Sequence, residues 1–177
     1  IKPFYSISIK NTGVKSEKKV DEVRDVLLKN KADYLLITAP ENVAWILNIR
    51  GYDSSFSPIP NARLLIDNKG ESYLFANPKK LTKIKNIKVH NCDERRMENI
   101  LSQLSGKNIW LDSASCSIFY KNLLKKRNKI IEKIDPIYFF KSIKNNVEIN
   151  NIKKSHLADG IALTKFLFWL KKNFKKK

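Results

Sequence analysis

Short apolar runs alternate with amphipathic stretches along this chain, and turn residues separate them. The run DYLLIT at residues 33–38 is typical of a strand that is covered on both faces of a sheet. Residues 16–31 instead place Val20, Val23 and Leu27 on one face of an amphipathic helix. Because strands and helices alternate, with one hairpin inside the series, we predict an α/β fold in which a mixed β-sheet is flanked by helices.

The remaining elements follow from turn and capping signals. Pro40 suits the first turn of a short helix, which Gly51 can end. Asn68-Lys69-Gly70 joins the two strands of the hairpin, with glycine supplying a positive φ. Strands are predicted over 63–67, 71–75, 87–91, 109–112 and 130–134. Helices are predicted over 93–104 and 117–127, and a brief helix begins at Asn77-Pro78. Residues 1–10 are predicted to be extended, and residues 52–61 to form a loop.

A long helix is predicted at the C-terminal end, after a short apolar connector at 137–143. Asn145 caps this helix, and Glu148 at the third helical position completes a capping box. The helix reaches about Phe174, and its apolar stripe includes Ile149, Ile152, Leu163, Phe166 and Leu170. Such a helix needs a packing partner, either the sheet domain or a neighbouring domain. If that neighbour is missing, the exposed apolar face favours self-association.

The net charge of +18, from 35 Lys and Arg against 17 Asp and Glu, leaves a second class of function open. A basic α/β module could bind nucleic acid or an anionic surface, and aromatic residues beside lysines, as in Phe119-Tyr120-Lys121, could stack on bases. Lysines are spread over almost every segment, however, and acidic residues lie between them. The abundance of Lys, Asn and Ile also matches A/T-rich codons. We therefore favour a compositional origin for the charge and do not expect nucleic acid as a partner.

Cysteine and histidine are too scarce and too scattered to predict a zinc site. Cys92 and Cys116 lie outside any metal-ligand spacing, while His90 and His156 complete a poor ligand set, and His90 has no identifiable partner. Free thiols in an intracellular, cytoplasmic protein are the plainest interpretation, and a single disulfide stays open. No apolar run is long enough to cross a bilayer, so no membrane partner is expected.

Two further groups of polar residues support weaker hypotheses. Asp33, Asp67 and Asp112 lie at predicted strand ends, where three converging carboxylates could hold a nuclease metal. Aspartate is also an ordinary turn and cap residue, and we favour that interpretation. His156 and Asp159 are neighbours on one helical face and could form an acid–base or metal pair. We favour a structural, hydrogen-bonded histidine instead.

Residues 38–51, TAPENVAWILNIRG, resemble the segment TAxDEIAWLxNLRG of the three-domain Xaa-Pro aminopeptidases (aminopeptidase P) of the creatinase/prolidase superfamily. Near the C-terminus, Lys144-Asn145 followed by Glu148 resembles the KNxxE helix that opens the catalytic domain of that family. The match keeps one order over nearly the whole chain and is loose over 81–129. Departures from the family pattern occur at Asn11, Lys15, Pro40 and Asn42.

The resemblance implies a creatinase N-terminal-like domain that is not itself catalytic. The chain begins without methionine or a signal-peptide pattern, so we interpret it as part of a longer protein. We divide it into a lead-in from a preceding domain (1–10), the α/β domain (11–136), and a connector with the first helix of a metallopeptidase catalytic domain (137–177). The partners expected are the other domains of the same parent chain and peptides that carry proline second.

In the family, the catalytic domain removes an N-terminal residue that precedes proline. The resemblance implies two divalent ions, with manganese the expected metal, held by two Asp, one His and two Glu. None of these ligands can be placed on this sequence. We therefore expect neither a metal nor catalysis in this chain alone.

The same resemblance directs attention to Trp45, Asn48, Arg50, Gly51 and Asp53 as a surface that faces the active-site cleft or another domain. Arg50 could pair with the carboxylate of a peptide or with an acid of the catalytic domain. In the alternative interpretation, Trp45 packs in the core, Gly51 ends a helix, and Arg50 forms an ordinary ion pair between domains.

Overall fold

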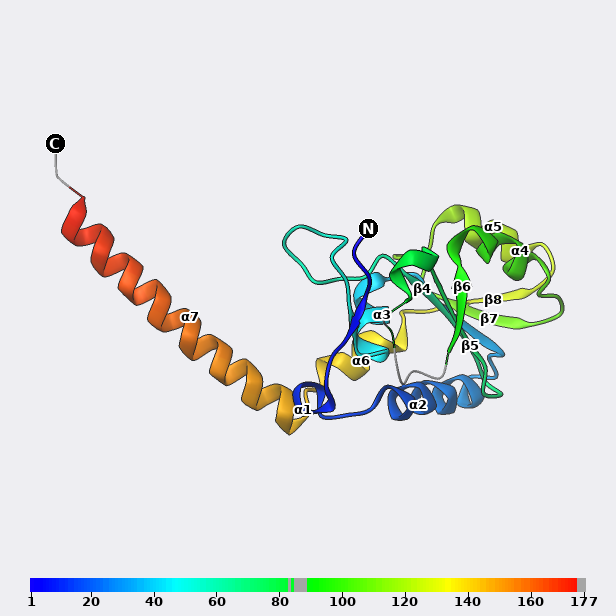
Figure 1. Cartoon of the computed structure of the whole chain (residues 1–177). Helices are drawn as coiled ribbons and strands as arrows, with labels where there is room; N and C mark the ends of the chain where they lie inside the picture. Colours follow the sequence, from blue (N-terminus) through cyan, green and yellow to red (C-terminus); the bar gives the residue numbers. More distant parts are fainter. Residues whose placement is uncertain (83, 85–88, 175–177) are drawn as a thin grey trace.

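The computed structural model describes residues 1–82, 84 and 89–174, and six of its eight described strands form a mixed sheet (Figure 1). The strands, in the order β6-β5-β4-β2-β7-β8, are β6 (His90–Asp93), β5 (Ser72–Ala76), β4 (Arg63–Asp67), β2 (Tyr34–Ile37), β7 (Asn108–Leu111) and β8 (Lys129–Glu132). β2 pairs antiparallel with β4 and parallel with β7. The predicted fold class is confirmed, while the first part of the strand expected over 87–91 lies outside the described residues.

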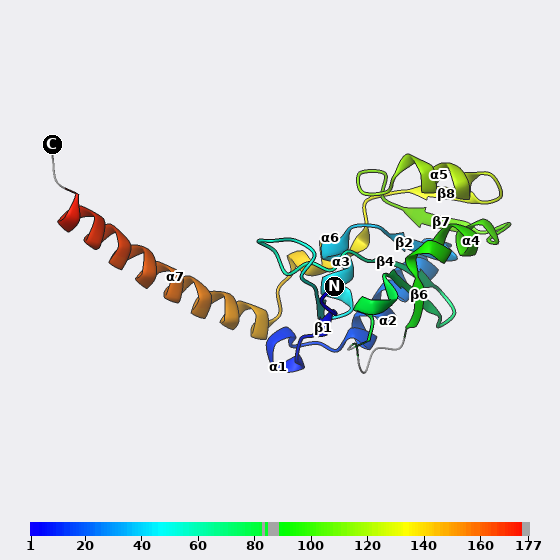
Figure 2. The same cartoon turned by 45° about the horizontal axis from the view of Figure 1, so that its top comes forward.

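Helices cover both faces of this sheet (Figure 2). One face carries α2 (Ser16–Lys29), α3 (Pro40–Ile46) and α6 (Pro136–Ser142). The other carries α4 (Met97–Ser102) and α5 (Ile118–Lys125). Each set of helices packs on its own hydrophobic cluster, so the sheet lies between two cores. Two short 3-10 turns, η1 (Pro78–Lys80) and η2 (Glu94–Arg96), follow β5 and β6.

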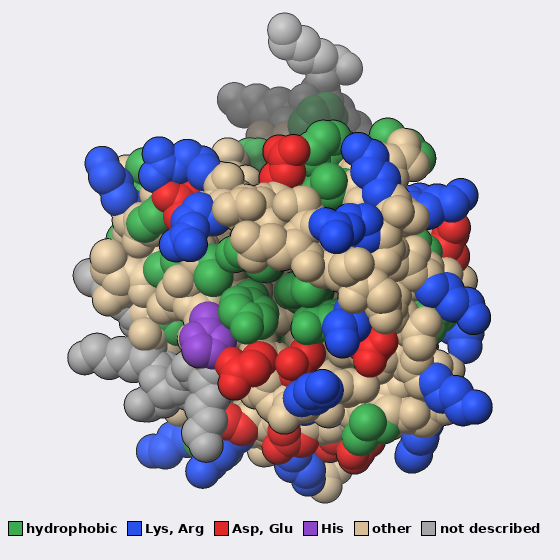
Figure 3. Space-filling view, turned by 90° about the vertical axis from the view of Figure 1, so that its right-hand side faces the viewer, with side chains coloured by type: hydrophobic (Ala, Val, Ile, Leu, Met, Phe, Trp, Pro, Cys, Tyr) green, Lys and Arg blue, Asp and Glu red, His purple; other side chains and the backbone are tan. Residues whose placement is uncertain are grey.

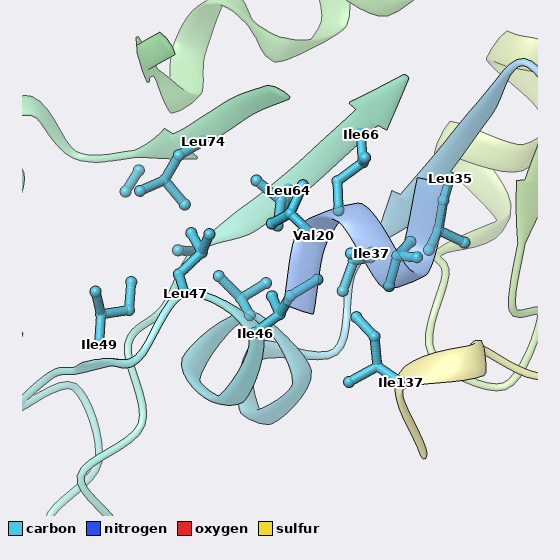
Figure 4. Close-up of a cluster of buried hydrophobic side chains, with 14 of the residues drawn as sticks. Val20, Leu35, Ile37, Ile46, Leu47, Ile49, Leu64, Ile66, Leu74 and Ile137 are labelled. Atoms are coloured by element: carbon cyan, nitrogen blue, oxygen red, sulfur yellow. The ribbon is translucent and has the colours of Figure 1, made fainter. Parts of the chain in front are cut away.

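Strand β2 is buried on both faces of the sheet, as its apolar composition predicts. Leu35 and Ile37 join the cluster beneath α2, α3 and α6, where they pack with Ile46 (Figure 4). Leu36 belongs to the opposite cluster, which α4 and α5 cover. Neighbouring residues alternate between the two cores because side chains along a strand point to opposite faces in turn.

The N-terminal residues contact the sheet domain directly. Phe4 is fully buried in the larger cluster. Strand β1 (Tyr5–Ser6) pairs antiparallel with β3 (Ile49–Arg50) in a separate two-stranded sheet. The division of the chain into lead-in, domain and connector stays a prediction, but residues 4–6 already pack against the domain.

Two short helices lie where the sequence predicts an extended stretch and an apolar connector. Ser8 caps α1 (Ile9–Thr12), and Gly13, at a φ of 74°, ends it. Asp135 caps α6, since its Oδ1 accepts a hydrogen bond from the backbone nitrogen of Ile137 at 2.9 Å. Both predictions are wrong at these points because each helix is too short to show an apolar period, so only its caps could reveal it.

Gly51 does not end α3, contrary to the interpretation from sequence. The helix ends at Ile46, Asn48 takes a positive φ of 52°, and β3 follows. A Cβ on residue 51 would lie 2.7 Å from Pro60 Cα and 3.1 Å from the ring of Phe4. Glycine is required here because the neighbouring backbone approaches too closely for any side chain.

The long helix α7 (Asn146–Asn173) extends away from the rest of the molecule (Figures 1 and 2). Its predicted capping box is confirmed, and none of its residues is buried. Its exposed apolar side chains include Leu157, Ile161, Leu163, Phe166, Leu167, Phe168, Trp169 and Leu170. Over residues 1–82, 84 and 89–174, no helix combines the length and the apolar character that crossing a membrane requires.

Candidate functional site

Trp45, the first of the five site residues predicted from sequence, lies between a cation and an anion. The Lys19 Nζ lies 3.9 Å from the centroid of the indole ring and donates a hydrogen bond to the Trp45 backbone oxygen at 2.9 Å. On its other side, Trp45 Nε1 donates to Glu148 Oε1 at 3.2 Å. The ring is only partly buried and packs against the larger cluster. Trp45 therefore connects α2, α3 and α7.

Lys19 is a buried cation, with 2% of its surface exposed. Burial lowers its pKa from the ordinary 10.5 to about 8, and this effect outweighs the opposing influence of the Glu148 carboxylate. The nearby positive charge of Arg50 also lowers the pKa of Lys19. Lys19 falls where the first helix of the resembling family carries lysine, but it was not among the predicted site residues. Its position beside Val20 on the apolar face of α2 is the signal that could have revealed it.

Asn48 completes the surroundings of the lysine. Its Oδ1 accepts from Lys19 Nζ at 2.8 Å, and its Nδ2 donates to the Val14 backbone oxygen at 2.8 Å. Asparagine tolerates the left-handed conformation that this residue adopts better than most residues do. The side chain is buried, and both its oxygen and its nitrogen are hydrogen-bonded, so we assign it the role of orienting the lysine.

Arg50 keeps part of its guanidinium available. Its Nη1 donates to the backbone oxygens of Ala44 at 3.1 Å and Ile49 at 2.8 Å. Among the described residues no carboxylate forms an ion pair with it. Burial lowers the pKa of Arg50 because the cation loses part of its hydration. A carboxylate that reached this group would replace the lost hydration.

A surface hollow of ≈ 400 Å³ lies between these residues and the start of α7. Three of the five predicted site residues line it, namely Trp45, Asn48 and Arg50, together with Ile7, Asn11, Thr12, Lys19, Glu148 and Asn151. These three residues form part of one side of the hollow. Glu148 and Asn151 were not associated with it, because they lie far along the chain on another helix.

Gly51 and Asp53 organise the adjoining loop rather than the hollow. Asp53 Oδ2 accepts from the Asn61 backbone nitrogen at 2.6 Å, and its Oδ1 accepts from Lys80. These contacts close the base of the loop over 52–61, and Gly51 packs beneath it against Pro60. Both residues support the position of Arg50 indirectly.

The three aspartates considered as a metal site do not converge. Asp33 and Asp67 lie at one end of the sheet, where they accept from the backbone nitrogens of Asn108 and of the hairpin turn. Asp112 follows β7 at the opposite end, and accepts from the backbone of Asp135 at 3.0 Å. Within the described part of the chain, no group of three or more His, Cys, Asp or Glu side chains could hold a metal ion.

The histidines also differ from expectation. His90 has a partner after all, since its Nε2 contacts the carboxylate of Glu71 and its ring stacks on Tyr73 with centroids 5.1 Å apart. His156 and Asp159 are both exposed on α7. In the part of the chain that the structure describes, neither forms the side-chain hydrogen bond expected for a structural histidine. Cys92 and Cys116 are free thiols.

Comparison with known proteins identifies one domain family that matches most of this chain. Residues 1–148 match the sequence model of the Creatinase/Prolidase N-terminal domain. The chain is 34% identical to Xaa-Pro aminopeptidase 1 of Dictyostelium discoideum over 98% of its own length, and 32% identical to Xaa-Pro aminopeptidase ApepP of Drosophila melanogaster over 94%. It spans 28% of the length of each of these relatives.

Solved structures show the same fold. The X-prolyl aminopeptidase from Caenorhabditis elegans, described as a cytosolic enzyme with a di-nuclear active site, superposes with a TM-score of 0.85 at 24% identity, over 97% of this chain and 29% of that one. The prolidase from Pyrococcus horikoshii gives a TM-score of 0.62 at 24% identity, over 90% of this chain and 44% of that one.

Proposed function

Because the chain belongs to the creatinase/prolidase N-terminal domain family, we propose that it is the domain preceding the catalytic domain of an Xaa-Pro aminopeptidase, together with the first helix of that catalytic domain. The longer enzyme would remove an N-terminal residue that precedes proline. One observation carries the proposal. The family model ends at residue 148, but the similarity to the Dictyostelium aminopeptidase covers 98% of the chain and so continues along α7.

The hydrolytic chemistry is assigned to residues outside this chain. The described residues do not fit a dinuclear metal centre, since no cluster of suitable ligands occurs among them. Two divalent ions, with manganese the expected metal, would be held by the catalytic domain, and the cytoplasm is the expected location. This chain would contribute a wall of the active-site cleft and contacts that assemble the domains.

Within that role, Arg50 is the group proposed to contact a carboxylate. Its guanidinium lines the hollow beside α7, and the described residues offer it no carboxylate partner. The partner would be the carboxylate of a short peptide substrate or an acid of the catalytic domain. Charge-assisted hydrogen bonds of this kind are short and strong, and arginine can form two of them in parallel.

The test compares this chain with the longer polypeptide on a peptide that carries proline second, with manganese and with a chelator. We expect metal-dependent cleavage by the longer polypeptide and none by this chain. Arg50→Ala in the longer polypeptide should then lower kcat/KM about tenfold or more, the effect of one charge-assisted hydrogen bond. Arg95→Ala is the matched control, because the side chain of Arg95 is 83% exposed. Cleavage by this chain alone would contradict the proposal.

A further inference from the structure

The first turn of α7 is bonded to the rest of the molecule through its own capping residues. The two carboxylate oxygens of Glu148 accept hydrogen bonds from different partners. Oε2 accepts from the backbone nitrogen of Asn145 at 2.9 Å and so caps the helix, whereas Oε1 accepts from Trp45 Nε1 of α3 at 3.2 Å. The capping interaction and the contact between elements therefore share one side chain.

Asn145 makes the corresponding connection to α1. Its Oδ1 accepts from the backbone nitrogens of Val147 and Glu148, and its Nδ2 donates to the Thr12 backbone oxygen at 2.9 Å. Gly13 lies directly beneath it, where a Cβ would be 2.5 Å from Asn145 Oδ1. The start of α7 is thus held on two sides, by α1 and by α3.

Trp45 is itself fixed, so the contact with Glu148 has a rigid base. Lys19 lies over the ring and bonds to the backbone oxygen of Trp45, and it is buried in turn. A cation over the indole face withdraws electron density from the ring, which makes the ring N–H a better donor to the carboxylate. The Lys19 cation, the Trp45 ring and the Glu148 carboxylate thus form a continuous series of contacts from α2 through α3 to α7.

Beyond this first region, α7 has no buried residue that could hold its direction. Its 28 residues extend about 42 Å at the rise of an α-helix, so a tilt of about 10° at the start displaces the far end by about 7 Å. A small loss of order at residues 145–148 is therefore amplified along the helix. Catalytic geometry is sensitive to displacements of about 1 Å.

We propose that Glu148, Asn145 and Trp45 form a rigid joint that sets the direction in which α7 leaves the sheet domain. If the proposed function holds, these three are positioning residues, because α7 leads into the catalytic domain and its direction would place that domain against the hollow at Arg50. The joint itself is a property of this chain and does not depend on any activity.

The test measures the distance distribution between spin labels on the two parts. The labels are attached to Lys126→Cys on the domain and to Lys165→Cys on α7. Both native cysteines are replaced, by Cys92→Ser and Cys116→Ala, so that only the introduced residues react. The parent distribution should be narrow. Trp45→Phe keeps an aromatic ring and the capping box but removes the N–H donor. It should raise the population outside the main peak about fivefold, as expected for one lost hydrogen bond. The helix content by circular dichroism should stay unchanged.

Trp169→Phe makes the same chemical change on the exposed part of α7 and should leave the distribution as it was. Glu148→Gln is the second variant, in case Trp45→Phe fails to fold. It retains one oxygen acceptor and should broaden the distribution. The proposal is contradicted if the distance distribution of the parent chain is already broad. It is also contradicted if the folded Trp45→Phe and Glu148→Gln chains both give the same distribution as the parent. Since no activity is measured, failure here is distinct from failure of the proposed function.

Discussion

Lys19 is the residue on which most contacts of the candidate site depend. It bonds to the backbone oxygen of Trp45 and to the side chain of Asn48, and its charge lies over the indole ring. The charges around it are Glu148 of α7, Arg50 of β3 and Glu22 of α2. A buried ammonium with this many partners is maintained for its geometry, because burial alone would disfavour its charge.

The lowered pKa of Lys19 predicts how stability changes with pH. Its pKa in the folded chain is about 8, below the ordinary 10.5, so between these values the unfolded chain binds more protons. Lys19 should therefore contribute stability that rises with pH across this window, by up to about 1.4 kcal/mol per pH unit. Urea unfolding at several pH values would measure it. Lys19→Met should lack this rise, and an identical pH dependence in both chains would refute the assignment.

Gly51 offers a second test at the scale of one residue. Gly51→Ala should lower the free energy of unfolding by about 1–3 kcal/mol, because its Cβ would meet the backbone of Pro60, which cannot move aside easily. Gly160→Ala is the control, since a Cβ there meets open space. Urea unfolding followed by tryptophan fluorescence reports both. Equal stability of the two variants would show that the loop relaxes.

Among single residues, the sequence predicted groups that lie close together along the chain. Trp45, Asn48 and Arg50 share one short segment, and the structure brings all three to the hollow. Their partners could not be predicted, since Lys19 is 26 residues from Trp45 and Glu148 is 103 residues away. Such contacts depend on how α2 and α7 pack against α3, and local patterns do not contain that information.

At the scale of elements, local hydrogen bonds explain which predictions succeeded. The hairpin β4–β5 and the start of α7 are each fixed by a side chain that bonds to nearby backbone, so their sequence signals are strong. Helices α1 and α6 were missed because they are short and their positions depend on tertiary packing, as the burial of Ile137 shows. The role of Gly51 was misread for the same reason.

Asp67 allows a test of the hairpin as an element. Its Oδ1 accepts from the backbone nitrogens of Lys69, Gly70 and Glu71 at 2.9, 2.8 and 2.8 Å. Asp67→Ala should therefore lower the free energy of unfolding by about 1–3 kcal/mol, measured by urea titration. Asp159→Ala, on the exposed face of α7, should change it by less than about 0.5 kcal/mol. A negligible effect at Asp67 would mean that water replaces the carboxylate in the turn.

For the whole molecule, the alternation of strands and helices predicted the fold class but not the strand order. The order depends on pairings such as β2 with β7, which lie far apart along the chain. The sequence also left the packing of α7 open. In the structure, the helix extends from the domain, and among the described residues the hydrogen bonds that join the two lie near the start of the helix.

The charge of the whole molecule supports a further prediction. On the face shown in Figure 3, Lys and Arg side chains are spread around the surface with Asp and Glu between them, not gathered in one patch. Binding of a mixed-sequence oligonucleotide should therefore be no tighter than the non-specific range, about 10⁻⁶ M at physiological salt. Fluorescence anisotropy over a salt series measures it. Nanomolar affinity would instead support the basic binding module.

The most direct test of the proposed enzyme is its discrimination between second residues. The longer polypeptide that contains this chain would be assayed with manganese on two peptides that differ only in carrying proline or alanine second, and kcat/KM would be determined for each. We expect release of the first residue from the proline peptide and little or none from the alanine peptide. Cleavage of both at similar rates, or of neither, would contradict the proposed function of the domain's parent enzyme.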